Sequence, residues 1–448
     1  MPLHGQLTVL PYQSLWRRLR QILRNDKVLI RRSRGDLLPQ VPRVMLSRMM
    51  DANRILTTHV GSLIRPPRLI EFLKRTEEGL DYDHNAFEAC LTESVAEIVQ
   101  QQAASGVDIV SDGEFGKNGS WSWYIGRRIS GIIQRPATAE EINDPLLALG
   151  PWRDLAAFPE FYAEYFPIQN LRAPSVPSRS VCQGPIRYTG HQLIARDVAN
   201  LKAAVVKANV QGAFLPVVAP FSAFPTLKNE YYSSERDLLI GLAEAMREEY
   251  RAIIEAGLTL QIDDAFLPFM YERLVPPMTL QQYRVWAEMR VDALNHALEG
   301  IPEERTRYHV CWGSWNGPHT FDVPMKDIVD LILKVRVGAY LFEAANPRHE
   351  HEWKVWQDVK LPANRSLAPG VISHATNVVE HPELVAERLV RIARIVGRER
   401  VMGGTDCGFA QGPFIRRVHP TIQWAKLKAL AEGAQLATAE LWGRKQYA

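Results

Sequence analysis

The sequence predicts an α/β protein built as a (β/α)8 TIM barrel, with an inserted aromatic-rich lid segment and an N-terminal extension. Two observations predict this fold. After residue 53, short β-branched and apolar runs alternate with stretches whose apolar residues recur three and four positions apart. Each short run also ends in a polar residue, and in a barrel the carboxyl ends of all eight strands meet at one face.

Eight segments have the composition of strands, and four of the intervening segments have clear helical periodicity. The expected strands are residues 55–61, 107–111, 212–219, 258–263, 308–312, 339–343, 367–373 and 401–405. The clearest helices are residues 234–256, 280–298, 382–396 and 422–436. An open doubly wound sheet would not bring all the strand ends together, so the barrel explains the pattern better.

Two segments stand apart from this repeat. We expect residues 1–50 to form a basic, disordered extension and residues 51–448 to form the barrel. Residues 119–179 form an insertion rich in aromatic side chains, including Trp121 and Tyr162. Long excursions from a compact domain are often lids or binding loops, but these aromatics could equally pack a small core over the barrel rim.

The extension holds ten Arg or Lys residues against Asp26 and Asp36, a net charge of +8 within a total of +3. An Arg-rich amphipathic start is typical of a mitochondrial targeting peptide, although serine is scarce here. An upstream start codon, with the working protein beginning near Met49 or Met50, is the alternative. The remainder carries −5, which gives no reason to expect a nucleic-acid partner.

Composition narrows the class of protein further. With 46% hydrophobic and 23% charged residues, the chain is typical of a globular protein. Its apolar stretches fall short of the roughly 20 residues of a membrane span, so we expect no membrane partner. Four cysteines are too few for a disulfide framework in a chain this long. We therefore expect a reducing compartment and a cytoplasmic location, or a mitochondrial one if the extension is a targeting peptide.

The polar residues that end the predicted strands should converge at the carboxyl face of the barrel. They are His59 and Ser62, Asp112 and Glu114, Asp263 and Asp264, His309 and Cys311, Glu343, His374, and Asp406 and Cys407. Cys90 and Cys182 have no such setting, and we expect them to be inert.

His309 and Cys311 are two residues apart, which on a strand puts both side chains on one face. Cys407 and Glu343 end two other predicted strands. Two thiols, an imidazole and a carboxylate suit Zn²⁺ better than Mg²⁺ or Ca²⁺. His-x-Cys also occurs by chance, and a lone buried cysteine usually behaves as a small hydrophobe.

The ordered motifs of the chain resemble those of the catalytic barrel of the cobalamin-independent methionine synthase family, from about residue 54 onward. They are ILTTHVGS at 55–62, DIVSDGE at 108–114, QIDD at 261–264, HVC at 309–311, FE at 342–343 and GTDCG at 404–408. The resemblance implies a zinc-dependent 5-methyltetrahydropteroyltriglutamate–homocysteine S-methyltransferase activity that makes methionine.

The resemblance also implies roles for single residues. His309, Cys311, Glu343 and Cys407 correspond to the zinc ligands of the family. Ser62, Glu114 and Asp263 correspond to the residues that grip the amino-acid thiol, and His374 to the acid/base histidine. On its own, His374 could be a strand-end histidine bonded to the backbone. The expected partners are zinc, a small thiol such as homocysteine, and a methyl or alkyl donor.

Two departures from the family leave the donor open. The chain holds one barrel's worth of sequence, where the full-length synthase has two, and residues 216–225 lack the tryptophan that the family places against the pterin. The alternatives are an epoxyalkane–coenzyme M transferase-like addition of a thiol, and a non-catalytic zinc barrel. A sulfonate thiol needs cations, for which Arg65, Lys117, Arg127, Arg128 and Arg348 are candidates. The oligomeric state is not predicted.

Overall fold

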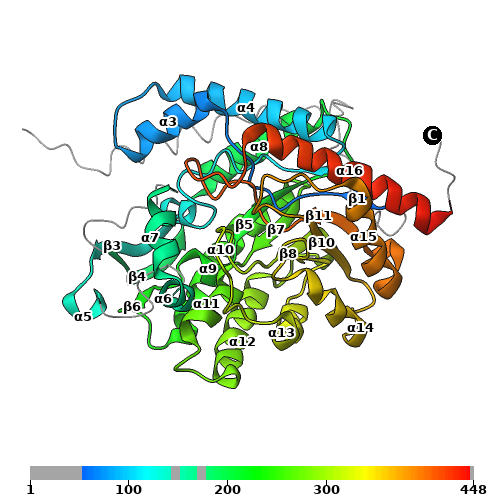
Figure 1. Ribbon diagram of the computed structural model, residues 1–448. Coiled ribbons are helices and arrows are strands. Elements are labelled where there is room, and N and C mark those ends of the chain that lie inside the picture. The colour runs from blue at the N-terminus through cyan, green and yellow to red at the C-terminus, as the bar shows by residue number, and fades with distance from the viewer. Residues whose placement is uncertain (1–52, 143–151, 169–177, 444–448) are drawn as a thin grey trace, which may run out of the picture. The chain divides into compact units, whose positions relative to one another are not determined.

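The computed structural model describes residues 53–142, 152–168 and 178–443 (Figure 1). The predicted extension, residues 1–50, lies outside the described residues, as do two stretches of the predicted insertion. No helix in the described ranges has both the length and the apolar character that crossing a membrane would require.

The predicted barrel is confirmed, and each of the eight expected strands is present. Its strands are β1 (Leu56–Thr57), β2 (Ile109–Val110), β5 (Gly212–Val218), β7 (Thr259–Asp263), β8 (Thr306–His309), β9 (Ala339–Glu343), β10 (Ser366–Ile372) and β11 (Met402–Thr405). They pair in parallel in the order β1-β11-β10-β9-β8-β7-β5-β2. The parallel pairing places every strand end at the same face (Figure 1).

The barrel closes between β1 and β2 through single contacts rather than a full ladder. The backbone N–H of Asp108 donates to the carbonyl of Thr57 at 3.1 Å, and the Thr58 hydroxyl donates to the carbonyl of Ile109 at 3.0 Å. A third bond, from Leu63 N–H to the Gly113 carbonyl at 3.1 Å, lies beyond the strand ends. These bonds bring the loops after β1 and β2 side by side, and both loops carry predicted site residues.

Helices surround the barrel, and several begin at side-chain caps. The helices are α3 (Pro67–Glu77), α4 (His84–Ala104), α5 (Ala139–Ile142), α6 (Trp152–Ala157), α7 (Pro159–Ile168), α8 (His191–Val205), α9 (Pro220–Ala223), α10 (Glu235–Glu255), α11 (Phe266–Leu274), α12 (Leu280–Ala297), α13 (Val329–Lys334), α14 (Val355–Asp358), α15 (Pro382–Val396) and α16 (Pro420–Trp442). Ser234 and Thr279 accept backbone N–H bonds at the starts of α10 and α12, which fixes where these predicted helices begin.

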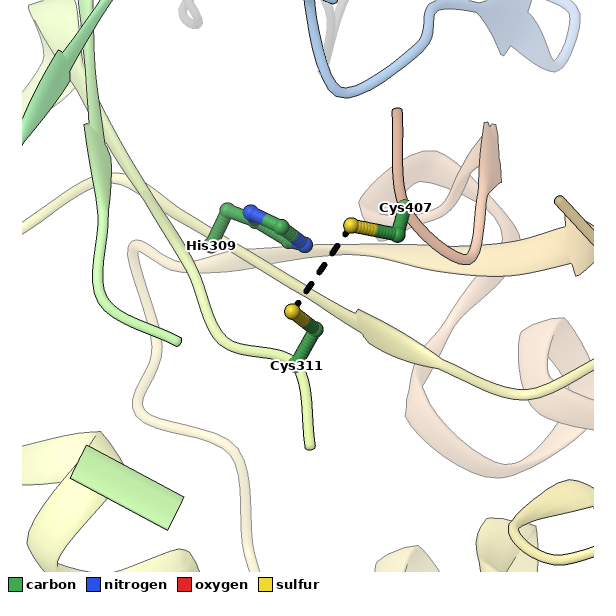
Figure 2. A group of neighbouring side chains, drawn as sticks. All are labelled: His309, Cys311 and Cys407. Carbon is green, nitrogen blue, oxygen red and sulfur yellow. Dashed lines mark hydrogen bonds between the residues drawn. The ribbon is translucent and has the colours of Figure 1, made fainter. Parts of the chain in front are cut away.

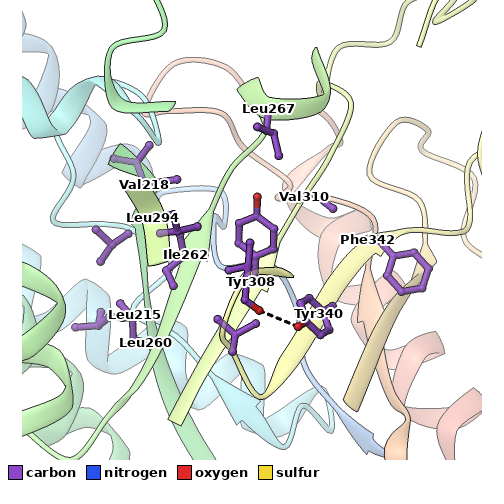
Figure 3. Close-up of a cluster of buried hydrophobic side chains, with 14 of the residues drawn as sticks. Leu215, Val218, Leu260, Ile262, Leu267, Leu294, Tyr308, Val310, Tyr340 and Phe342 are labelled. Carbon is purple, nitrogen blue, oxygen red and sulfur yellow. Dashed lines mark hydrogen bonds between the residues drawn. The ribbon is translucent and has the colours of Figure 1, made fainter. Parts of the chain in front are cut away.

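The alternation of side chains along the strands separates two cores. Outward-facing residues such as Ile262, Tyr308 and Tyr340 pack against the helices (Figure 3). A smaller apolar cluster, including Phe214, Leu341 and Met402, belongs to a separate core. The outward-facing side chains supply hydrophobic stabilisation by packing against the helices. The inward-facing positions near the strand ends are therefore available for polar residues.

A small second sheet accompanies the predicted insertion. Its strands are β3 (Ile129–Pro136), β4 (Ser178–Tyr188) and β6 (Lys228–Asn229), with β3 and β4 antiparallel. Periodicity in the sequence did not reveal these strands, because their exposed faces interrupt the apolar pattern. The second sheet continues past residue 179, so the excursion is longer than the predicted insertion.

Candidate metal and thiol site

Three of the four predicted metal ligands lie together. The side chains of His309, Cys311 and Cys407 are all buried, and each offers one donor atom within 4.8 Å of the other two (Figure 2). The two sulfur atoms are 3.7 Å apart, which is far longer than a disulfide bond of about 2.05 Å, and both thiols are free. The cluster of these three residues, hereafter the thiol cluster, joins the end of β8 to the end of β11.

The strand β8 positions two members of this cluster through its period of two residues. Arg307, His309 and Cys311 follow one another at alternate positions. The guanidinium of Arg307 donates to the Thr58 hydroxyl and the His59 carbonyl, both at 2.8 Å. This buried arginine thereby joins β8 to the segment that follows β1.

The imidazole of His309 is oriented by a carboxylate. Its Nδ1 lies 3.0 Å from Oδ1 of Asp263, which ends the neighbouring strand β7. When Nδ1 carries the proton for this bond, Nε2 is left with a lone pair to bind a metal. Burial alone would lower the pKa of His309, but Asp263 and Cys407 raise it to about 10 in the metal-free protein.

The two thiols have different proton affinities. The contact between the two thiols, together with His309, holds the pKa of Cys407 well below its usual range despite burial. Cys407 is therefore the first thiolate of the pair. A metal ligand must be deprotonated, so the cluster already contains one ligand in the required state.

The donor set and its spacing fit a zinc ion. Zinc binds thiolate sulfur at about 2.3 Å, and two such ligands at a tetrahedral angle would be about 3.8 Å apart. The observed sulfur separation of 3.7 Å matches this value. Sulfur and imidazole donors also favour zinc over oxygen-preferring cations.

The fourth predicted ligand, Glu343, does not join the group of three. One of its carboxylate oxygens accepts the backbone N–H of Trp312 at 3.0 Å, and the other accepts from the Asn346 amide. Burial raises the pKa of Glu343 to about 7, and the charge of Glu343 in turn raises the pKa of Cys311. The carboxylate thus borders the thiol cluster but is held by the loops after β8 and β9.

His374 is buried, and neither of its ring nitrogens has a hydrogen-bond partner among the described residues. Burial lowers its pKa to about 4, so the imidazole is neutral at pH 7. Its charge, when present, would act on Cys407.

A cavity of about 200 Å³ opens beside the thiol cluster and brings the predicted substrate residues together. Its walls include Ser62, Glu114 and Asp263 as well as the three cluster residues. The hydroxyl of Ser62 is buried without a hydrogen-bond partner in the described part of the chain. A buried, unpaired hydroxyl beside a cavity is available to a ligand.

Glu114 has an unusual backbone conformation at the mouth of β2. Its φ of 63° lies in the left-handed region, directly after Gly113 at 69°. The Asp112 carboxylate accepts the Glu114 N–H at 2.9 Å, and the Glu114 carboxylate pairs with Lys117 at 2.6 Å. Local strain of this kind is often found where a side chain must be aimed at a ligand.

The five cations proposed from the sequence do not line the cavity. Arg128, one of the candidates for binding a sulfonate, is paired with Asp197 and Glu249 instead. Arg65 and Lys117 both bind Glu114, Arg348 donates to a loop carbonyl, and Arg127 is exposed. Apart from the exposed Arg127, these cations bind nearer protein groups and stabilise loops.

Sequence reasoning missed a different cation, Arg417, which does line the cavity. Its guanidinium donates to the hydroxyl of Tyr165 at 3.3 Å and lies 3.5 Å from that of Ser314. Burial lowers the pKa of Arg417. No sequence motif marks it, because it lies in the irregular segment after Cys407, where no strand or helix period applies.

Aromatic residues of the insertion line the cavity and also pack against its wall. Trp121 lines the cavity and stacks on Phe266 with ring centroids 5.7 Å apart. Tyr162 is buried and accepts from Trp315, another lining residue, at 2.9 Å. Aromatic residues of the insertion therefore pack against the wall of the cavity, while the side chain of Trp152 lies outside the described part.

Comparison with known proteins gives no match to any protein-family model. The chain is 23% identical to methionine synthase from Saccharolobus solfataricus over 395 residues, which cover 87% of this chain and 97% of that protein. It is 22% identical to the methionine synthase of Thermococcus kodakarensis over 86% of this chain and 94% of that protein. Similarity to 2-hydroxypropyl-CoM lyase from Xanthobacter autotrophicus is 28% over 49% of this chain, which covers only 59% of that relative.

Solved structures share the fold. A B12-independent methionine synthase from Shewanella sp. W3-18-1, in complex with selenomethionine, is 18% identical with a TM-score of 0.62, covering 87% of this chain and 99% of that one. A putative vitamin-B12 independent methionine synthase from Listeria monocytogenes is 17% identical with a TM-score of 0.58, covering 85% and 98%. The chain is thus similar to methionine synthases over nearly the whole length of these curated relatives.

Proposed function

We propose that this protein is a zinc-dependent thiol S-methyltransferase that makes methionine from homocysteine. The observation that carries the proposal is the group of His309, Cys311 and Cys407, whose donor atoms lie within 4.8 Å of one another beside a cavity. The curated methionine synthases that match most of the chain support the same activity.

Zinc, when bound, would favour the thiolate form of a substrate thiol and so make it a nucleophile at neutral pH. We propose that Glu343 would hold the zinc together with His309, Cys311 and Cys407. Glu343 is suited to this role because it borders the cluster and already has two other hydrogen-bond donors to hold it.

The protein side chains of the cavity would bind and orient an amino-acid thiol. Glu114 and Asp263 are buried carboxylates that could accept the substrate ammonium, and Ser62 offers an unpaired hydroxyl. Asp263 also holds His309, so it would couple the thiol position to the metal-binding imidazole.

His374 is proposed as the group that moves the proton. Because its imidazole is neutral, it can accept the proton that the substrate thiol loses. As the sulfur–carbon bond forms and the bond to the leaving atom breaks, the same proton would pass to that atom. No proton is then lost or gained overall.

A second candidate function is the alkylation of a sulfonate thiol such as coenzyme M. Two observations favour it: the 28% identity to 2-hydroxypropyl-CoM lyase over 244 residues, and the presence of Arg417 in the cavity wall. A third, a zinc barrel without catalysis, would bind metal but no thiol.

The test is the metal content of purified full-length protein beside Cys407→Ser, with Cys182→Ser as the matched control. Cys182 is also buried, but it lies in β4, outside the thiol cluster. We expect one zinc per chain in the wild type and the control, and a large loss in Cys407→Ser. X-ray absorption at the zinc edge should then gain a sulfur ligand when homocysteine is added.

Other outcomes separate the alternatives. A wild type that neither contains nor takes up zinc would overturn the proposal. Zinc that gains sulfur from coenzyme M but not from homocysteine would establish the second function, and zinc that ignores both thiols would point to the third. Methionine formation from homocysteine and methyl-tetrahydrofolate, followed by mass spectrometry, would then identify the donor.

A further inference from the structure

The cavity beside the thiol cluster holds two buried carboxylates but only one group with a permanent positive charge among its described lining residues. That group is the guanidinium of Arg417, in the segment between Cys407 and α16. It therefore carries the charge opposite to that of the two carboxylates in the same wall.

Arg417 has no carboxylate within ion-pair distance in the described part of the chain. Its guanidinium contacts two neutral hydroxyls, those of Tyr165 and Ser314, at 3.3 and 3.5 Å. These distances are long for a guanidinium, and its Nε is buried without a partner. A largely buried cation without a counter-ion is costly, so this one is suited to an anion that arrives with a ligand.

Two buried arginines outside the cavity are neutralised within the fold, whereas the buried Arg307 donates to neutral groups. Arg128 is neutralised by Asp197 and Glu249 at 2.6 and 2.9 Å, and Arg388 pairs with Glu350 at 2.9 Å. The neighbour of Arg417, Arg416, is exposed and lies outside the cavity wall. Position 417 is thus distinguished by its place in the wall as well as by its charge.

We propose that Arg417 binds the anionic end group, a carboxylate or a sulfonate, of the thiol substrate and so selects anionic thiols over neutral ones. This inference rests on the proposed function of the site. The planar fork of a guanidinium matches either oxyanion through two parallel hydrogen bonds. Glu114 and Asp263 can receive an ammonium on the same molecule, which fits a zwitterionic thiol.

The experiment is isothermal titration of zinc-loaded full-length protein with homocysteine, coenzyme M and neutral 2-mercaptoethanol. Arg417→Met is compared with the matched variant Arg416→Met. We expect Arg417→Met to weaken binding of the anionic thiols by about 10- to 100-fold, the range for a charged hydrogen-bonding group, and to leave 2-mercaptoethanol within about 3-fold. Arg416→Met should behave like the wild type.

Comparing the loss of affinity for homocysteine with that for coenzyme M identifies the anion. The larger loss on homocysteine would assign a carboxylate, and the larger loss on coenzyme M a sulfonate. Equal affinities of the wild type and Arg417→Met for both anionic thiols would overturn the inference, as would an equal loss with 2-mercaptoethanol. If Arg417→Met does not fold, Arg417→Lys replaces it, with a smaller loss expected on the anionic thiols alone.

Two thioethers separate this inference from the proposed function. L-methionine and 2-(methylthio)ethanesulfonate carry the anion but no thiol, so their binding does not require thiol activation. If no thiol adds sulfur to the zinc, the proposed function fails, yet a loss of thioether binding in Arg417→Met would still support the anion site. Thiol activation with no dependence on Arg417 would refute the anion site alone.

Discussion

Two groups of buried ionisable side chains in this protein differ in where their partners come from. In the ion cluster, formed by Arg128, Asp197 and Glu249, both carboxylates pair with the guanidinium, and Tyr188 donates to Glu249 at 2.5 Å. In the thiol cluster, donor atoms converge on one another at the wall of a cavity, and the two sulfurs are joined by a weak contact of 3.7 Å.

Buried charges with a structural role can be told from those with a functional role by the source of their partners. Charges that neutralise each other within the fold have a structural role, because removing one leaves another buried and unpaired. Donors that converge beside a cavity gain their partner from outside the chain. The same degree of burial therefore carries opposite meanings in the two clusters.

The largest expected effect is the loss of one member of the ion cluster. Arg128→Met leaves the buried Glu249 carboxylate without its cation, while Asp197 keeps its pair with Arg196, and we expect the free energy of unfolding to fall by about 3–5 kcal/mol. Cys407→Ala, measured on metal-free protein with chelator present, should cost clearly less, since it removes a small side chain with weak contacts. Urea unfolding followed by circular dichroism measures the free energy of unfolding of both variants. Equal losses would contradict the distinction between the two clusters.

An intermediate effect is expected where the thiol cluster depends on a supporting carboxylate. Asp263→Asn removes the charge that orients His309, and we expect zinc affinity to fall by about 10- to 100-fold. The matched control is Asp264→Asn, because Asp264 also follows β7 but bonds to Ser222 and Tyr308 instead. Competition with a fluorescent zinc chelator measures both variants, and a similar loss in Asp264→Asn would argue against orientation of His309 as the cause.

The smallest expected effect is a pH dependence that belongs to the ion cluster. Burial alone would raise the pKa of Asp197, but Arg128 and Arg196 outweigh it and hold that pKa below its usual value. A depressed carboxyl pKa stabilises the fold above the unfolded value of about 3.9 and loses that contribution as the pH falls further. Stability should therefore fall more steeply below about pH 4 in the wild type than in Asp197→Asn.

Chemical denaturation at a series of pH values between about 3 and 6 would measure this difference. Parallel curves for the wild type and Asp197→Asn would mean that Asp197 contributes no pH-dependent stability. The thiol cluster offers no comparable test, because metal binding changes the protonation of its own ligands.

Much of the barrel and part of the site could be predicted from the sequence. The eight strands were predicted because apolar runs with polar ends recur, and β9 was predicted to the residue. Convergence of His309, Cys311 and Cys407 followed from the parallel barrel, which brings strand ends together whatever their loops do. The engagement of Glu343 with Trp312 and Asn346 could not be predicted, since both partners lie in irregular loops.

The partners of the cations could not be predicted from the sequence either. Arg128 was a candidate for binding a ligand because it lies in a plausible loop, yet its partners are 69 and 121 residues away along the chain. Arg417 was overlooked because nothing near it in the sequence carries a period. Partner choice for a long charged side chain is decided by whichever opposite charge the fold brings closest.

By itself, the sequence determined the barrel, the order of its strands along the chain and the residues that end them. These follow from local periods of 2 and 3.6 residues and from the geometry shared by parallel barrels. Only the tertiary structure decided which buried polar groups neutralise one another and which face a cavity, because that depends on distances between residues far apart in the chain. Arg128 and Arg417 are the same residue type. Only the fold shows that Arg128 is paired within the protein and that Arg417 lines the cavity.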